Sequence, residues 1–267
     1  MRLFILLSTN YAEFTRLSIL IKQVISAIGK KLDHFVPFKT RQVLSLLLGP
    51  LEMCFAGTAY GMNALFPIFQ ENGIYGEVCS NSTAGCSEQL VIYANAFTTV
   101  CIMPGFLGAV LGFLIDKIGL RIVNLISTFM NFLGLLLFVF LKPSNAVIIF
   151  IGGTLSSVGG VGMIICSLSV SKLFTKTASM VTTLIQGVFD TSSAIFAFVY
   201  LTNEAQFSFK SSFLILAIGC LVSGMSNSLF VMSYWMEDML KYKENVDKTL
   251  TIVSEFDIYE VRRKPLL

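Results

Sequence analysis

The chain has 267 residues, of which 55% are hydrophobic and 13% are charged. Soluble globular domains carry about 25% charged residues, so this composition excludes an ordinary water-facing surface and indicates a membrane protein. The formal net charge of +3 says little by itself, but the positions of the charges along the chain are informative.

Residues 1–43 are predicted to form a cytoplasmic N-terminal segment that contains an amphipathic helix. The apolar core of the first ten residues is only five residues long. A signal peptide needs about 7 to 15, so we expect no cleavage here. Apolar residues then recur at helical spacing, with Lys22, Gln23 and Ser26 on the opposite side. This helix either lies on the membrane surface or packs under a helical bundle, and the two alternatives stay open. Its apolar positions are Leu17, Leu20, Ile21, Val24, Ile25 and Ile28.

Residues 44–235 contain six apolar runs that are long enough to cross a bilayer. A hydrocarbon core of about 30 Å needs roughly 20 mostly apolar residues in a helix. Because unpaired backbone amides are too costly in hydrocarbon, and because the runs show no polar–apolar alternation, we expect helices rather than strands. The predicted fold is therefore an all-α membrane protein with a six-helix transmembrane bundle. The runs cover residues 44–69, 90–115, 121–141, 146–174, 179–201 and 212–235.

The basic residues predict how the runs are oriented in the membrane. Seventeen of the 19 Lys and Arg residues lie in the two terminal segments and in the loops after the second and fourth runs. The positive-inside rule places these regions in the cytoplasm, so both termini are predicted to be cytoplasmic. Residues 236–267 are then a polar cytoplasmic tail, and we expect an integral protein of the plasma membrane.

The loop between the first and second runs is predicted to face outside, and it carries two features of extracellular loops. Asn81-Ser82-Thr83 is an acceptor pattern for N-glycosylation. Cys79 and Cys86 can form a disulfide in an oxidising compartment. The alternative is an unmodified loop with two free thiols.

A short charged stretch, GFLIDKIGLR at 112–121, separates the second and third runs. Gly112 permits two helices to approach closely, and Gly119 suits a tight turn. Asp116 can accept hydrogen bonds at a helix N-terminus or pair with a cation. Lys117 and Arg121 are expected at the level of the lipid headgroups. An ordinary inside loop would explain the two bases, but it would not explain their combination with two glycines and an acid.

This stretch resembles the loop motif that joins the second and third helices of the major facilitator superfamily. The resemblance implies a six-helix bundle that is the N-terminal half of that fold. It also implies a cytoplasmic latch that holds the outward-facing state closed on the inside. Leu120 departs from the basic residue often found in the motif. The matching residues are Gly112, Asp116, Lys117, Gly119 and Arg121.

Three further stretches are similar to solute carrier family 43, whose members carry purine nucleobases or large neutral amino acids by facilitated diffusion. They are LEMCFAGTAYG at 51–61, LSVSKLF at 168–174 and IQGVFDTSSAIF at 185–196. The Phe-Asp-x-Ser-Ser-Ala run at 189–194 looks most like the nucleobase-carrying branch. The likeness extends over about residues 44–234 and covers only the N-terminal half of a family member.

Two acidic residues, Glu52 and Asp190, lie deep within apolar runs. A carboxylate there costs about 2.5 to 3.5 kcal/mol on insertion scales, so it is expected to face a cavity or a partner. Gln186 lies one helical turn before Asp190 on the same face, and Ser193 follows. Carboxylates accept hydrogen bonds from the N–H groups of a purine, and the resemblance places similar residues in a central cavity. We therefore expect Glu52, Gln186, Asp190 and Ser193 to bind substrate; the alternative is that the acids bond to neighbouring helices and only specify packing.

The sequence offers no feature of an enzyme. His34 is the single histidine, so a multi-histidine metal site and a Ser/His/Asp triad within the spans are excluded, and no nucleotide-binding loop is present. We expect no cofactor, no metal and no nucleic-acid partner. The predicted function is facilitative transport of small polar solutes, with purine nucleobases preferred. The alternatives are a carrier of large neutral amino acids, or a non-transporting partner of a full-length carrier. The expected partners are the solute, the lipid bilayer and a second six-helix half or a full-length carrier.

Overall fold

The computed structural model describes residues 37–79, 85–174, 177–205 and 207–232. The chain divides into two units, Met1–Tyr234 and Trp235–Leu267, and only the first contains described residues. The predicted amphipathic helix and the polar tail at 236–267 lie outside the described residues, so both stay predictions.

The regular elements in the described ranges are all helical, and six helical stretches are long and apolar enough to cross a membrane. Each of the six predicted runs overlaps one of these stretches, which confirms the all-α membrane fold. The stretches are Lys39–Glu71, Ser87–Ile118, Leu120–Val139, Ile148–Leu173, Ala178–Glu204 and Phe209–Phe230.

The first and fifth stretches are broken helices, which the sequence did not predict. The first consists of α2 (Phe38–Ala56), a 3-10 helix η1 (Thr58–Leu65) and the short α3 (Phe66–Glu71). The fifth consists of α7 (Ala178–Ser192) and α8 (Ile195–Glu204). The other four are α4 (Ser87–Ile118), α5 (Leu120–Val139), α6 (Ile148–Val170) with the 3-10 turn η4 (Ser171–Leu173), and α9 (Phe209–Phe230).

The two breaks cross each other, and glycines make the crossing possible. A Cβ atom on Gly57 would lie 2.3 Å from the carbonyl oxygen of Phe189, and one on Gly61 would lie 1.9 Å from that of Ser193. Both distances are far below van der Waals contact, so only glycine fits at these positions. The end of α2 and the start of η1 therefore rest directly on the backbone where α7 ends.

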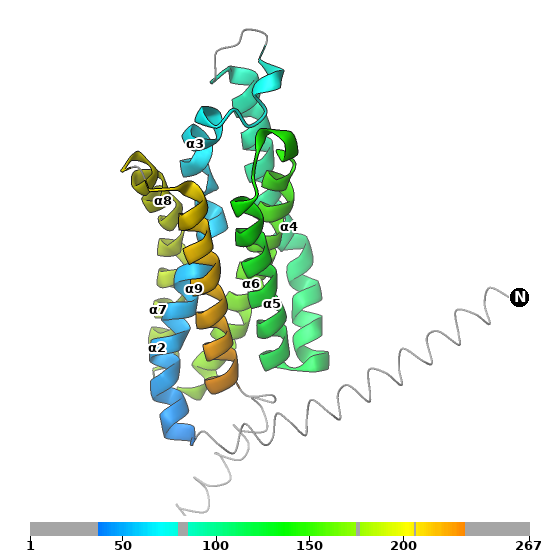
Figure 1. The fold of residues 1–267 in the computed structure, drawn as a ribbon. Coiled ribbons are helices and arrows are strands. Elements are labelled where there is room, and N and C mark those ends of the chain that lie inside the picture. Colours follow the sequence, from blue (N-terminus) through cyan, green and yellow to red (C-terminus); the bar gives the residue numbers. More distant parts are fainter. Residues whose placement is uncertain (1–36, 80–84, 175–176, 206, 233–267) are drawn as a thin grey trace, which may run out of the picture. The chain divides into compact units, whose positions relative to one another are not determined.

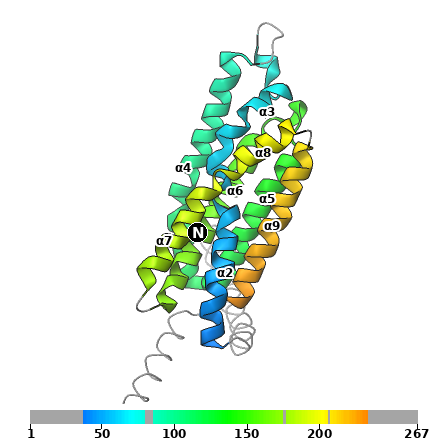
Figure 2. The ribbon, with the colours of Figure 1, turned by 90° about the vertical axis from the view of Figure 1, so that its left-hand side faces the viewer.

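The helices pack in two groups that share α6. On one side α4 and α5 pack against α6, and on the other side α2 packs against α6, α7 and α9 (Figure 1). Figure 2 shows α2 lying between α7 and α9. The helix α5 joins the groups because it also packs along α9.

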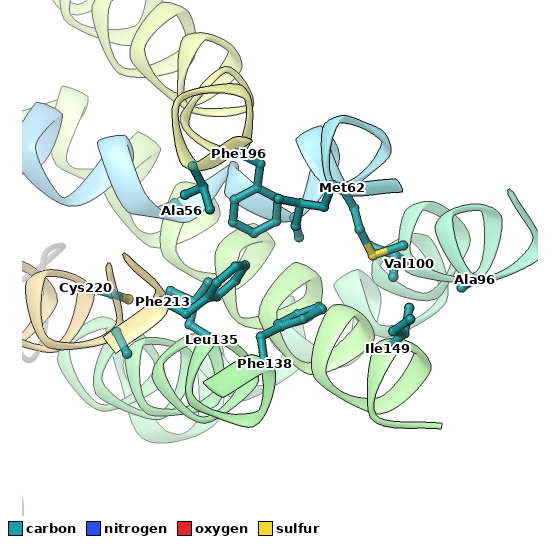
Figure 3. Close-up of a cluster of buried hydrophobic side chains, with 14 of the residues drawn as sticks. Ala56, Met62, Ala96, Val100, Leu135, Phe138, Ile149, Phe196, Phe213 and Cys220 are labelled. Carbon is teal, nitrogen blue, oxygen red and sulfur yellow. The ribbon is translucent and has the colours of Figure 1, made fainter. Parts of the chain in front are cut away.

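An aromatic cluster fills one end of the bundle (Figure 3). The ring of Phe138 on α5 lies 5.0 Å from that of Phe213 on α9, and Phe213 lies 5.3 Å from Phe196 on α8. These offset and tilted arrangements are the ones that aromatic pairs prefer. Large apolar side chains also cover the outside of the bundle, as expected for a surface in contact with lipid; Phe106, Phe113, Ile215 and Val222 are exposed.

We expect Gly160→Ala to destabilise the bundle, because a Cβ at this position on α6 would lie 1.9 Å from the carbonyl oxygen of Ala56. Overpacking of this kind costs about 1–3 kcal/mol. The matched control is Gly105→Ala on α4, where a Cβ meets nothing within 4 Å. Both variants gain the same helix propensity, so thermal unfolding of the purified proteins in detergent isolates the clash. Equal melting temperatures for the two variants would contradict the close α2–α6 contact.

Candidate functional site

One side of α7 carries a polar and aromatic surface. Gln186 and Asp190 are exposed and lie one turn apart. Phe189 lies beside them, and its ring meets that of Tyr60 on η1 edge to face, with ring centres 5.8 Å apart. Both aromatic side chains are half-buried. Two acceptor or donor groups and an aromatic pair therefore share one surface at the crossing of the broken helices.

The two serines after Asp190 are bound to their own helix. Ser193 is half-buried, and its hydroxyl donates to the carbonyl oxygen of Asp190 at 2.8 Å. Ser192 is buried and donates to the carbonyl oxygen of Phe189 at 2.6 Å. These bonds supply hydrogen-bond donors to carbonyl oxygens in the last turn of α7, where the helix ends. Ser193 lies on the same side of α7 as Gln186 and Asp190, whereas Ser192 points into the protein.

Glu52 lies elsewhere: its side chain is fully buried among four helices. Its Oε1 accepts a hydrogen bond from Nδ2 of Asn124 on α5 at 2.7 Å. Its Oε2 accepts from the Ser167 hydroxyl on α6 at 3.2 Å and from Nδ2 of Asn227 on α9. The structure does not bring Glu52 together with Gln186, Asp190 and Ser193. Its contacts correspond to the packing alternative of the sequence analysis.

The orientation of the two amides shows how strongly the carboxylate organises this region. Asn124 also donates to the Ser228 hydroxyl at 2.8 Å. The Oδ1 atoms of Asn124 and Asn227 are buried without a hydrogen-bond partner among the described residues. A buried amide oxygen without a hydrogen bond costs free energy. Both asparagines nevertheless direct their NH₂ groups to Glu52, so the hydrogen bonds to the carboxylate determine how the two amides are oriented. Sequence reasoning missed both asparagines, although two amides within apolar runs were a visible signal.

The two basic residues of the charged stretch between α4 and α5 have different surroundings: Lys117 is exposed, whereas Arg121 is buried. Gly119 turns the chain between the two helices with φ +89°. Asp116 and Lys117 are exposed, and the Lys117 Nζ atom lies 5.5 Å from the centre of the Phe113 ring. A Cβ on Gly112 would meet nothing within 4 Å, so no described helix packs closely there.

Arg121 is buried within the bundle. Its Nε atom donates to the carbonyl oxygens of Ser228 at 3.2 Å and Met232 at 2.9 Å. These carbonyls lie at the C-terminal end of α9, where the helix dipole is negative and a cation is favoured. Arg121 therefore joins the start of α5 to the end of α9.

The loop between α3 and α4 is closed by a disulfide between Cys79 and Cys86, whose Cα atoms lie 5.9 Å apart. Gln89, at the start of α4, donates to the carbonyl oxygen of Ile74 at 2.6 Å, and the Tyr93 hydroxyl donates to the same oxygen at 2.5 Å. The loop is thus fixed to the start of α4. Asn81 belongs to the segment 80–84, which lies outside the described residues, so its glycosylation stays a prediction.

Comparison with known proteins identifies the family. Residues 39–266 match the sequence model of the Major Facilitator Superfamily. The chain therefore belongs to this superfamily. This confirms the family expected from the loop motif and the predicted six-helix bundle of that fold.

One similar relative is equilibrative nucleobase transporter 1 of Bos taurus, which is 28% identical over 193 residues. The matched region is 68% of this chain and 39% of the relative. The chain thus spans less than half of the length of that curated relative.

Exchanging the carboxylate and an amide should test the Glu52 network. We expect Glu52→Gln to destabilise the bundle by about 1.5–3 kcal/mol, because the new amide NH₂ group only donates and leaves one of the two asparagine donors without an acceptor. The double variant Glu52→Gln/Asn227→Asp keeps both shapes and moves the carboxylate to α9. It should recover a substantial part of the lost stability. Thermal unfolding in detergent measures both, and a double variant no more stable than Glu52→Gln would refute the pairing.

Proposed function

We propose that this chain forms the N-terminal six-span half of a facilitative carrier, and that its substrates are flat heterocycles, with purine nucleobases as the preferred class. The observation that carries this proposal is the Tyr60–Phe189 pair beside Gln186 and Asp190. Aromatic rings offer a surface on which a planar base can pack. The Asp190 carboxylate can accept from purine N–H groups, and the Gln186 amide can both donate and accept. The similarity to a relative named as a nucleobase transporter supports the same class.

The proposed site is open on the side away from the bundle, which fits a site shared by two halves. Substrates of such carriers bind near the bilayer midplane between two structural repeats. Gln186 and Asp190 are exposed in this bundle although they lie within a membrane span. We therefore propose that a second six-helix half, in the same or another polypeptide, covers this surface. Ser193 belongs to the proposed surface through its place on α7. Glu52 has a supporting role in this proposal, because its carboxylate is occupied by other helices.

The proposed orientation has both termini in the cytosol of a plasma-membrane protein. The distribution of basic residues supports it, as does the Cys79–Cys86 disulfide in the loop that would face outside. The loop from Gly112 to Arg121 would then lie on the cytosolic side and act as the latch of the carrier. The exposed Asp116 and Lys117 would bias closure there, while Gly119 and Arg121 hold the loop in place.

Uptake measurements should test the substrate class. In cells that express the chain, alone and together with a full-length carrier, we expect Asp190→Asn and Tyr60→Leu to lower adenine uptake by roughly tenfold, a loss of about 1.4 kcal/mol. Glu204→Gln, which alters another exposed acid at the end of α8, is the matched control and should leave uptake unchanged. Surface biotinylation corrects for expression.

Three outcomes of this experiment contradict the proposal. Leucine uptake without adenine uptake would favour the amino-acid carrier. Co-purification with a full-length carrier without any added uptake would favour the non-transporting partner. Equal loss in Glu204→Gln and Asp190→Asn would show that the effect does not depend on the proposed surface.

Glycosylation should test the orientation. When the chain is produced in mammalian cells, we expect peptide-N-glycosidase to increase its electrophoretic mobility. Asn81→Gln and Thr83→Ala should each give the faster form without treatment, because both destroy the acceptor pattern. Asn72→Gln, which lies outside any acceptor pattern, is the control. A wild-type protein that reaches the cell surface without a glycosidase-sensitive shift would count against modification of Asn81.

A further inference from the structure

A groove borders the side of α7 that faces away from the proposed substrate surface. It has a volume of about 510 Å³ and lies between Cys54 on α2 and the side chains of Leu184, Val188, Ile195 and Phe198 on α7 and α8. At 100° per residue, Leu184 and Val188 lie about 160° from Gln186 around α7. Thr183, which also lines the groove, lies within about 20° of Asp190. The groove therefore adjoins the surface that carries Asp190, and its apolar wall lies on the far side of α7 from Gln186.

The walls of the groove offer little to a polar ligand. Its hydroxyl groups already donate to their own helix: Thr183 to the carbonyl of Ser179 at 3.0 Å, and Thr191 to that of Gly187 at 2.7 Å. The third, Ser192, donates to the carbonyl oxygen of Phe189. The remaining lining groups are apolar apart from the weakly polar thiol of Cys54. A purine or an amino acid would lose its hydrogen bonds with water here and could regain only bonds to the oxygen atoms of these hydroxyl groups.

The groove lies at the depth of the hydrocarbon layer. Cys54 is in the middle of the first membrane stretch, and the α7 and α8 residues are in the middle of the fifth. The apolar surface continues along α2 through Leu51 and Leu47, which are 48% and 65% exposed. These residues and Cys54 follow each other at helical spacing, so they form one stripe along the helix.

We propose that this groove binds an acyl chain of a membrane lipid. An empty apolar groove in the bilayer would forfeit dispersion contacts on all its walls, and the medium that surrounds it consists of acyl chains. The stripe from Leu47 to Cys54 supplies an extended apolar track, and Phe198, 63% exposed, borders its end. The proposal depends on the membrane-spanning fold and not on the proposed substrate.

Gly187 allows the groove to be filled selectively. A Cβ at this position meets nothing within 4 Å, so Gly187→Leu places a side chain in the open space. Ala194→Phe fills it from the α8 side and is a second, independent variant. The matched control is Gly105→Leu on α4, which also adds a side chain where nothing lies within 4 Å.

The experiment uses the full chain in vesicles of phosphatidylcholine that contain a phosphatidylcholine with a diazirine on its acyl chain. After illumination, peptide mass spectrometry locates the cross-links. We expect the groove peptides of the wild type to be labelled several-fold more than the exposed α4 peptide around Phe106. Gly187→Leu and Ala194→Phe should reduce groove labelling at least fivefold, whereas Gly105→Leu should not. Thermal unfolding confirms that each variant is folded.

Several results would overturn the proposal. Groove labelling equal to that around Phe106 in the wild type would mean that the lipid contact is unspecific. Undiminished labelling in the folded filled variants would place the lipid elsewhere. Absence of groove labelling, together with cross-linking of Cys54 to a second protein chain by a bifunctional thiol reagent, would mean that another protein covers the groove.

Discussion

A carboxylate inside a hydrocarbon layer must obtain its hydrogen bonds from the protein, and one end of this bundle is arranged around that requirement at Glu52. Its donors come from α5, α6 and α9, so a single side chain of α2 connects four of the six membrane stretches. Arg121 strengthens the same end, because it joins the start of α5 to the last carbonyls of α9. The other end of α5 carries Phe138, which belongs to the aromatic cluster. The bundle is thus held by polar contacts at one end and by ring packing at the other.

Two other polar side chains, Asn131 on α5 and Thr58 on η1, explain how the first stretch can break inside the membrane. A break leaves backbone carbonyls without their helical partners, and these must be satisfied within the protein. The carbonyl oxygen of Phe55 accepts from Nδ2 of Asn131 at 3.0 Å and from the Thr58 hydroxyl at 3.2 Å. The break at Gly57 follows directly, and it turns the chain so that Tyr60 meets Phe189. The residues of the proposed site therefore depend on side chains of α5 that never reach the substrate surface.

Local sequence features predicted the parts of the structure that depend on local physics. The length and hydropathy of the apolar runs located the six membrane stretches, because the thickness of a bilayer sets the length of a spanning helix. The spacing of Cys79 and Cys86 within one loop allowed their pairing to be anticipated. The place of Gln186 beside Asp190 followed from the helical repeat alone.

The features that were missed depend on contacts between distant segments. Glu52 and Asn227 are 175 residues apart in the sequence, and nothing near Glu52 shows that its partners come from other helices. The charged loop likewise gives no sign that the end of α9 supplies carbonyl acceptors for Arg121. The broken helices were also missed, because the glycines that permit the crossing are equally compatible with straight helices in close contact.

For both sides of α7, the repeat of the helix assigns residues to faces, whereas only the positions of α2 and η1 decide what each face can bind. On one face η1 adds Tyr60 to Phe189 and the polar groups stay exposed. On the other face α2 adds Cys54 and an apolar stripe while the threonines bond to their own backbone. Under the two proposals, α7 presents a solute-binding surface beside η1 and a lipid-binding surface beside α2, because the chain that crosses it changes from an α-helix to a 3-10 helix at Gly57.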